Sequence, residues 1–188
     1  MLLSMACYFE MAGDARTDRM VRFLLGEQMK DGGWNCRYRR KGATHASFHT
    51  TISVLEGLAA YSASPRTRRD VEAAQAEGRT FFLKHDLYRS SSTGNVVKSA
   101  FSKLSFPPRW YFDVLRGLEY FRSIAADRDE RLEDAIAVLR GKRRADGRWP
   151  AQNRHPGQTF FELERAGQPS RMNTLRALRV LGWWDDAA

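Results

Sequence analysis

Residues 106–121 read Phe106-Pro-Pro-Arg-Trp-Tyr-Phe-Asp-Val-Leu-Arg-Gly-Leu-Glu-Tyr-Phe121, and a similar pattern recurs sixty residues before and after them. The upstream copy is Thr51-Ile-Ser-Val-Leu-Glu-Gly-Leu58, and the downstream copy is Met172-Asn-Thr-Leu-Arg-Ala-Leu178. In this register three polar residues align, and so do two sets of leucines. The aligned positions are Ser53, Asp113 and Asn173, then Leu55, Leu115 and Leu175, then Leu58, Leu118 and Leu178. A fixed period of this size predicts an architecture built from repeated helical units.

The composition is that of a globular protein. Of the 188 residues, 43% are hydrophobic and 12% aromatic, which is enough to bury a substantial core. The two cysteines, Cys7 and Cys36, make neither a disulfide framework nor a spaced metal cluster, so we expect a reducing, cytoplasmic environment. The first nine residues are apolar but lack a basic leader, so we expect neither a signal peptide nor a transmembrane segment.

The chain is basic, with 31 Lys and Arg against 22 Asp and Glu and a formal net charge of +9. Such a balance permits nucleic acid, anionic lipid or phosphorylated ligands as partners. The positive residues are spread along the chain rather than clustered, which favours a solvated basic surface. We therefore expect no nucleic-acid partner.

Apolar residues at helical spacing predict seven helices and no strand, so the fold class is all-α. The first helix stands alone and the other six pair into three hairpins. Ser47 is a plausible cap for the third helix. Pro107 and Pro108 are expected to open the fifth, because proline is tolerated in the first turn of a helix. The other helices are expected at about 1–12, 17–30, 47–60, 68–84, 129–143 and 169–181.

Two helices end in the same corner motif, which has four positions at fixed spacing. A leucine comes first, then a glutamine or an arginine, then a glycine, and a tryptophan comes last. The copies are Leu24-x-x-x-Gln28-x-x-x-Gly32-x-Trp34 and Leu139-x-x-x-Arg143-x-x-x-Gly147-x-Trp149. Between them a degenerate copy has Phe81 and His85 at the Leu and Gln places, but no Gly-x-Trp follows. The glycine lets the chain turn at a helix end, and the tryptophan can pack under the next hairpin.

The corner motif resembles the repeat of squalene–hopene cyclases and related terpenoid cyclases, and the resemblance covers essentially the whole chain. It implies the α/α toroid that these enzymes share with protein prenyltransferases, in which inner and outer helices are concentric. One helix and three hairpins are fewer than a complete toroid needs. The resemblance therefore implies that residues 1–188 form a single, incomplete α/α-toroid domain of about seven helices.

The motifs that carry catalysis in these families are missing. The cyclases protonate their substrate with Asp-x-Asp-Asp, and the nearest string here, Asp127-Arg-Asp129-Glu130, has the features of a helix start. The prenyltransferases hold zinc with an Asp, a Cys and a His. The only close Cys/His group here, Cys36, His45 and His49, does not follow that pattern, so we expect no metal and no other cofactor.

Helical phase divides each inner helix between a packed face and a face turned to the central cavity. Taking Ser53, Asp113 and Asn173 as the centre of the cavity face places the paired leucines on the opposite side. Several more residues share that cavity face, and most are polar. They are His49, Glu56, Ala60, Arg109, Arg116, Tyr120, Arg176 and Val180. A face this polar is poorly suited to a carbocation cascade, which needs a dry aromatic pocket.

The leading hypothesis is a terpenoid-cyclase-like or prenyltransferase-like protein that binds a small-molecule or isoprenoid ligand in its concave face. In an enzyme, His49 would act as acid or base, Asp113 would orient it, and Asn173 would position the substrate. Arg109 and Asp113, four residues apart, could also pair on one helix. The expected ligand-binding residues are Arg109, Trp110, Arg116, Tyr120, Asn173 and Arg176.

Two alternatives remain open at this point. The protein could be a noncatalytic helical-repeat scaffold that holds an anionic partner through Arg109, Arg116 and Arg176. The polar residues could instead form the solvated face of an open half-ring.

The ends of an incomplete ring are expected to leave apolar helix flanks without neighbours, which indicates a homodimer. The expected flanks are Leu2, Leu3, Ala6 and Phe9 in the first helix, and Leu175, Leu178, Leu181 and Trp183 in the last.

Overall fold

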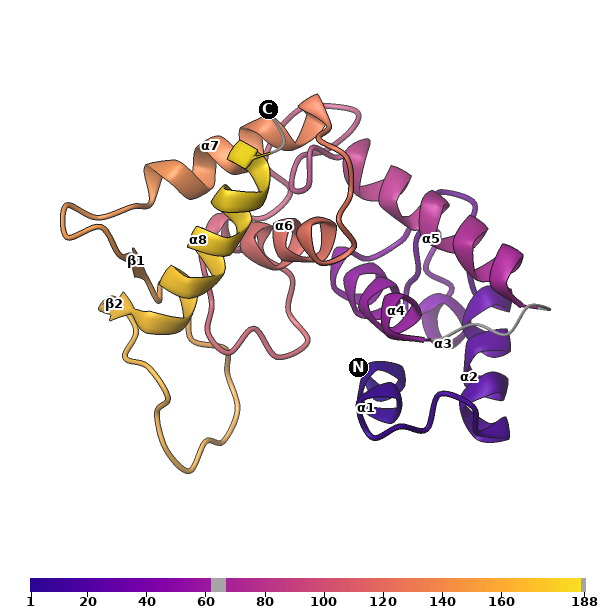
Figure 1. The fold of residues 1–188 in the computed structure, drawn as a ribbon. Helices are drawn as coiled ribbons and strands as arrows, with labels where there is room; N and C mark the ends of the chain where they lie inside the picture. Colours follow the sequence, from indigo (N-terminus) through magenta and orange to yellow (C-terminus); the bar gives the residue numbers. More distant parts are fainter. Residues whose placement is uncertain (62–66, 187–188) are drawn as a thin grey trace. The chain divides into compact units, whose positions relative to one another are not determined.

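The computed structural model of the protein describes residues 1–61 and 67–186 (Figure 1). The chain forms two compact units, Met1–Phe82 (unit 1) and Leu83–Ala188 (unit 2). The described residues contain eight α-helices and one two-stranded sheet, so the fold is all-α as predicted. The closed or open arrangement of a toroid, and a single partial domain spanning both units, stay predictions.

Five α-helices begin in unit 1. They are α1 (Leu2–Tyr8), α2 (Ala15–Gly26), α3 (Tyr38–Lys41), α4 (Phe48–Ala60) and α5 (Arg68–Leu83). The helices and strands of unit 2 are η1 (Ser99–Ser102), α6 (Val114–Ser123), η2 (Glu130–Leu132), α7 (Glu133–Gly141), β1 (Trp149–Pro150), β2 (Pro169–Ser170) and α8 (Arg171–Asp186). Strands β1 and β2 pair antiparallel, with Trp149 opposite Ser170.

The predicted start of the fifth helix at Pro107 is wrong. Helix α6 begins at Val114, because the Asp113 side chain accepts a hydrogen bond from the backbone N–H of Arg116 and caps the helix there. Arg109 has a positive φ of 51°, which interrupts any helix through this segment. Other boundaries also move: Asp14 caps α2, and the expected tail after Leu181 is helical as far as Asp186.

The sixty-residue register aligns different positions of the three helices. Ser47 stands at the N-cap of α4 and Asp113 at the N-cap of α6. Ser170 directly precedes α8, and its Oγ accepts a hydrogen bond from the backbone N–H of Asn173. Asp113 therefore corresponds to Ser47 and Ser170, whereas Ser53 and Asn173 lie inside their helices. The feature that recurs is therefore the start of a helix, and the three helix starts are unevenly spaced along the sequence.

The corner motif forms the same hydrogen bonds in both units. The indole Nε1–H of Trp34 donates to the Leu24 carbonyl at 2.7 Å, and that of Trp149 donates to the Leu139 carbonyl at 2.7 Å. Both tryptophan rings are almost completely buried. Each indole therefore ties the end of one helix to the turn that leads toward the next, which is the structural role predicted for it.

A threonine completes each corner from the following helix. Thr51 Oγ1 accepts the backbone N–H of Trp34 at 2.9 Å, and Thr174 Oγ1 accepts that of Trp149 at 3.0 Å. Thr51 lies in the first turn of α4 and Thr174 in the first turn of α8. This second contact joins the turn to the next helix, so the motif extends beyond the four residues recognised in the sequence.

The glycines of the two corners provide a matched test of this geometry. Gly32 and Gly147 both have positive φ, 89° and 79°, where a side chain is strained. We expect Gly147→Ala to cost about 1–2 kcal/mol from this strain alone, because its new Cβ would meet only the Arg143 side chain, at an ordinary contact distance of 3.6 Å. Gly32→Ala should cost more, since its new Cβ would lie 2.6 Å from the Glu77 carbonyl oxygen. Urea denaturation of the two variants measures the difference, and equal midpoint shifts would contradict it.

The core of unit 1 is built around α4. Leu3 of α1 packs against Gly57, where an added Cβ would lie 3.0 Å from the Leu3 Cβ. On α5, Gly78 lies equally close to the side chains of Leu55 and Trp34. These small residues let helices approach closely, and α1 lies along α4 in Figure 1. The predicted burial of the repeat leucines is confirmed for α4 and α6, in which Leu55, Leu58, Leu115 and Leu118 are fully buried.

The apolar flanks expected at the two ends are present in part. Leu3 is buried against α4, so its place in an unpaired flank was wrong. Leu2 and Phe9 are exposed, and Leu175 and Leu178 of α8 are about half exposed. Trp183 is partly buried and donates its indole N–H to the Ala126 carbonyl at 3.2 Å. The homodimer inferred from these flanks stays a prediction.

Candidate functional site

The two residues expected to share acid–base chemistry belong to different units. His49 lies in the first turn of α4 in unit 1, and Asp113 precedes α6 in unit 2. The pairing of their side chains therefore stays a prediction. Asp113 caps α6 within unit 2. Its carboxylate accepts hydrogen bonds from the backbone N–H groups of Arg116 at 2.9 Å and of Ser105 at 3.0 Å.

Arg176 joins α8 to α6 through its guanidinium group. Its Nε donates to Glu119 Oε2 at 2.6 Å, and its Nη1 donates to the Ser105 carbonyl at 3.2 Å and to Asn173 Oδ1 at 3.0 Å. The Asn173 amide in turn donates to the Pro150 carbonyl at 3.1 Å. Arg176 is only 7% exposed, so these contacts replace water around a charged side chain.

Arg116 is buried on the same side of the unit and donates from Nη1 to the Tyr111 carbonyl at 2.7 Å. Asp113, Arg116, Glu119, Asn173 and Arg176 form what we call the polar network. Its two guanidinium groups balance its two carboxylates. Burial raises the pKa of Asp113, while Arg176 and the two backbone amides oppose that rise. The network is electrically balanced and internally hydrogen-bonded.

The polar face predicted for the central cavity is buried on α6 and α8 of unit 2. Asp113, Arg116, Tyr120, Asn173 and Arg176 are all buried, so the interpretation of these residues as a solvated face is wrong. The anionic partner expected at Arg109, Arg116 and Arg176 stays a prediction. The burial of Arg176 is explained by the contact between α6 and α8, where its guanidinium pairs with Glu119 at 2.6 Å.

The proposed pair of Arg109 and Asp113 on one helix is also wrong, because Arg109 lies in a turn before α6. Its Nη1 donates instead to the Pro156 carbonyl at 2.9 Å. Trp110 is half exposed and stacks on Tyr111 at 3.8 Å between ring centroids. Arg109 and Trp110 are therefore the two predicted ligand-binding residues that reach toward the surface.

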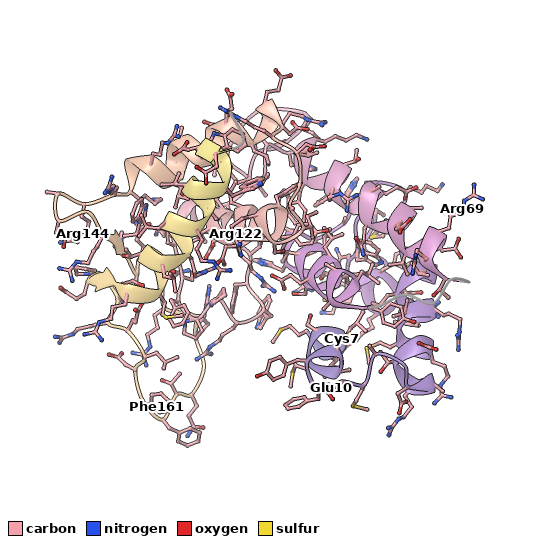
Figure 2. The ribbon with its side chains drawn as sticks, in the orientation of Figure 1. Cys7, Glu10, Arg69, Arg122, Arg144 and Phe161 are labelled. Carbon is pink, nitrogen blue, oxygen red and sulfur yellow. The ribbon has the colours of Figure 1, made fainter. Side chains whose placement is uncertain are left out.

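Arg109 lines a cavity of about 290 Å³ in unit 2, which we call the loop pocket. Its walls come from residues 106–109, and from residues 151–166 of the long loop that joins β1 to β2. Figure 1 shows this loop extending away from the two strands, and Figure 2 labels Phe161 near its far end.

Backbone contacts hold the two walls of the loop pocket together at their base. Ser105 and Asn153 form a parallel bridge, and the N–H of Gln152 donates to the Leu104 carbonyl at 2.7 Å. The loop also closes on itself, since the N–H of Gly167 donates to the Ala151 carbonyl at 2.6 Å. The base of the pocket is therefore ordered by hydrogen bonds between segments about fifty residues apart in sequence.

His155 is a buried polar residue in the lining of the loop pocket. Its ring stacks on Tyr111 at 3.7 Å with an interplanar angle of 6°, and the residue is 8% exposed. Its Nε2 is buried and has no hydrogen-bond partner among the described residues. Burial and the neighbouring Arg109 charge lower the pKa of His155, so the imidazole is neutral at neutral pH. A buried polar atom without a partner is costly, so this nitrogen is a candidate to bond a polar group of a ligand.

Three charged side chains of the loop pocket, Arg154, Glu162 and Glu164, have hydrogen-bond partners nearby, whereas Arg109 has no carboxylate partner among the described residues. Arg154 donates to Glu162 Oε1 at 2.6 Å and to Thr159 Oγ1 at 3.1 Å. Glu164 accepts the backbone N–H of Met172 at 3.0 Å and the hydroxyl of Ser170, at the N-terminus of α8. Arg109 has no carboxylate partner in the part of the chain that the structure describes.

Sequence reasoning missed His155 and this pocket. His155 lies in a long polar loop with no helical period, and a lone histidine in such a segment carries no recognisable pattern. Arg109 was selected, but for a helix face on which it does not lie. The stacking partner Tyr111 and the orphan Nε2 depend on contacts across more than forty residues.

Among the described residues, no group of three or more His, Cys, Asp or Glu side chains is placed to hold a metal ion. Within residues 1–61 and 67–186, no helix has the length and apolar character needed to cross a membrane.

Comparison with known proteins finds no match to this chain, whether among protein-family models, curated proteins or solved structures.

Proposed function

We propose that the chain binds a small ligand with an apolar, isoprenoid-like body in the loop pocket of unit 2. The observation that carries the proposal is the combination of an apolar wall with His155, whose buried Nε2 has no partner among the described residues. Ligand sites are typically concave and mostly apolar, with a few polar groups that orient the ligand. The cavity of about 290 Å³ is small for such a site, which favours a short ligand.

The apolar part of the wall suits a hydrocarbon chain. Phe106, Pro107, Phe160 and Leu163 line the pocket, and the two last side chains are largely exposed in the absence of a ligand. Covering them would contribute roughly 25 cal/mol for each Å² of apolar surface removed from water. The resemblance of the corner motif to terpenoid cyclases makes an isoprenoid the first candidate for the chain that would cover them.

Binding is proposed rather than cyclisation. The sequence lacks the Asp-rich acid motif of the cyclases, and the carboxylate of Asp113 is committed to capping α6 inside the polar network. On α6 and α8, where the ligand was first expected, Arg116 is buried and bonds the Tyr111 carbonyl, and Arg176 is buried and bonds Asn173. In the loop pocket, polar and apolar groups line one open volume together.

The proposal is tested by titrating geraniol, a short isoprenoid alcohol, into the protein by isothermal titration calorimetry. Ala166 is exposed and lines the loop pocket, so Ala166→Trp should fill it and weaken binding by about tenfold or more. Ala137→Trp is the matched control, because Ala137 is an exposed residue of α7 outside this pocket. Geraniol binding that survives Ala166→Trp unchanged would remove the loop pocket as its site.

A further inference from the structure

We propose that the loop pocket selects a ligand whose head group carries a single negative charge, a carboxylate, held by Arg109 beside His155. This inference rests on the proposed function and adds the chemical class of the ligand. It follows from which charges of the pocket are already satisfied and which polar atoms are not.

Three of the four charged side chains that line the pocket have strong partners. Arg154 and Glu162 pair with each other at 2.6 Å. Glu164 is bound by groups at the N-terminus of α8, where backbone N–H groups and the helix dipole favour a negative charge. Arg109 remains, because among the described residues its guanidinium donates to the neutral carbonyl of Pro156 and to no carboxylate.

The position of Arg109 is fixed by the backbone rather than by a counter-charge. Its φ of 51° places it in a tight turn, and its Nη1 is anchored 2.9 Å from the Pro156 carbonyl. Gly157 permits this approach, since a Cβ there would lie 2.8 Å from the same Nη1. A guanidinium held at one nitrogen still offers N–H groups in a planar fork, the geometry that matches a carboxylate.

His155 supplies a second hydrogen bond to the same head group. The residue lines the pocket, and its buried Nε2 has no partner among the described residues. As a neutral imidazole carrying its proton on Nε2, it would donate to one carboxylate oxygen while Arg109 holds the other. The stack on Tyr111 fixes the plane of the ring and therefore the direction of that bond.

The carboxylates of Glu162 and Glu164 limit the negative charge that the head group of the ligand can carry. Both line the pocket together with Arg109, which has no carboxylate partner among the described residues. A head group with several negative charges, such as a diphosphate, would place its extra charges near two carboxylates without further cations to offset them. A single carboxylate pairs with the positive charge of Arg109 and brings no further negative charge near the two glutamates.

The test compares geranic acid, geraniol and geranyl diphosphate, which share one hydrocarbon chain and differ in head group. Isothermal titration calorimetry at neutral pH should show geranic acid binding about tenfold or more tightly than geraniol, as a charge-assisted hydrogen bond provides. Geranyl diphosphate should bind less tightly than geranic acid. In Arg109→Gln the affinity for geranic acid should fall to that for geraniol, while geraniol binding is retained.

Arg165→Gln is the matched control, because it removes the same charge from an exposed position of the same loop outside the pocket lining. His155→Phe keeps an aromatic ring on Tyr111 and removes Nε2, and it should weaken geranic acid binding more than geraniol binding. Circular dichroism of each variant checks that it is folded.

The possible results separate the two proposals. Equal affinity for geranic acid and geraniol, or the same loss in Arg165→Gln as in Arg109→Gln, overturns the head-group inference and leaves the proposed function standing. Tighter binding of geranyl diphosphate overturns the limit to one charge. Binding of none of the three probes overturns the proposed function and this inference with it.

Discussion

Replacing Trp149 with alanine is expected to lower the free energy of unfolding by about 3–5 kcal/mol, the range for removing a buried large aromatic side chain. The indole has no exposed surface and donates its N–H to the Leu139 carbonyl at 2.7 Å. Its backbone N–H also bonds Thr174 of α8. The substitution therefore leaves a cavity and an unpaired carbonyl at the corner that joins α7 to α8.

Urea denaturation followed by circular dichroism measures this loss. Trp149→Phe should cost less, because the phenyl ring fills part of the cavity and only the N–H bond is removed. Trp110→Ala is the surface control, since Trp110 is about half exposed. If Trp149→Ala unfolds at the same urea concentration as the parent protein, the corner is not a packed structural element. Trp34, which makes the equivalent bond to Leu24, should respond in the same way in unit 1.

Replacing Arg176 with alanine is expected to destabilise the protein by about 3–5 kcal/mol, because it leaves charges of a buried network without their partner. Arg176 is 7% exposed and donates to Glu119, the Ser105 carbonyl and Asn173. Asp113 loses a favourable neighbouring charge at the same time. The exposed pair of Arg140 and Asp185 supplies the control, and Arg140→Ala should change stability by no more than about 1 kcal/mol.

The pH dependence of Arg176→Ala gives a second readout. Burial raises the pKa of Asp113 above its unfolded value, so the folded state binds the proton more tightly than the unfolded state. The stability that this proton provides is complete below the unfolded pKa and is lost as pH rises through the folded pKa. Without Arg176 the rise in pKa should be larger, so the deficit of the variant should shrink in acid. A deficit that is equal at all pH values, or equal to that of Arg140→Ala, would show that the network is not coupled through Asp113.

The elements that could be predicted from the sequence are those with a local physical cause. Ser47 stands at the start of α4 as expected, and the Leu24 and Leu139 motifs both end in a buried tryptophan after a glycine with positive φ. These features depend on residues within about a dozen positions of one another. Their signals are therefore present in the chain itself as spacing and residue type.

The start of α6 could not be predicted, although it lies within a short segment. Pro107 and Pro108 are acceptable at a helix start, and so is Asp113 as a cap. Contacts from outside the segment favour Asp113 as the cap. Its carboxylate also accepts the N–H of Ser105 and lies near the Arg176 charge. Because the predicted helix began too early, Arg109 was placed on the same helix as Asp113. The charged residues of α6 and α8 were assigned to a cavity face for the same reason.

The two kinds of feature differ in how far apart their interacting groups lie along the chain. Helical class and the corner motif follow from backbone hydrogen bonding and apolar periodicity over one or two turns, and the sequence alone was sufficient for them. The burial of Arg116 and Arg176, the stack of His155 on Tyr111 and the loop pocket arise when segments forty to seventy residues apart meet. A charge is buried only where its distant partners compensate it, so no local pattern distinguishes Arg176 from a solvated arginine, and packing alone establishes the difference.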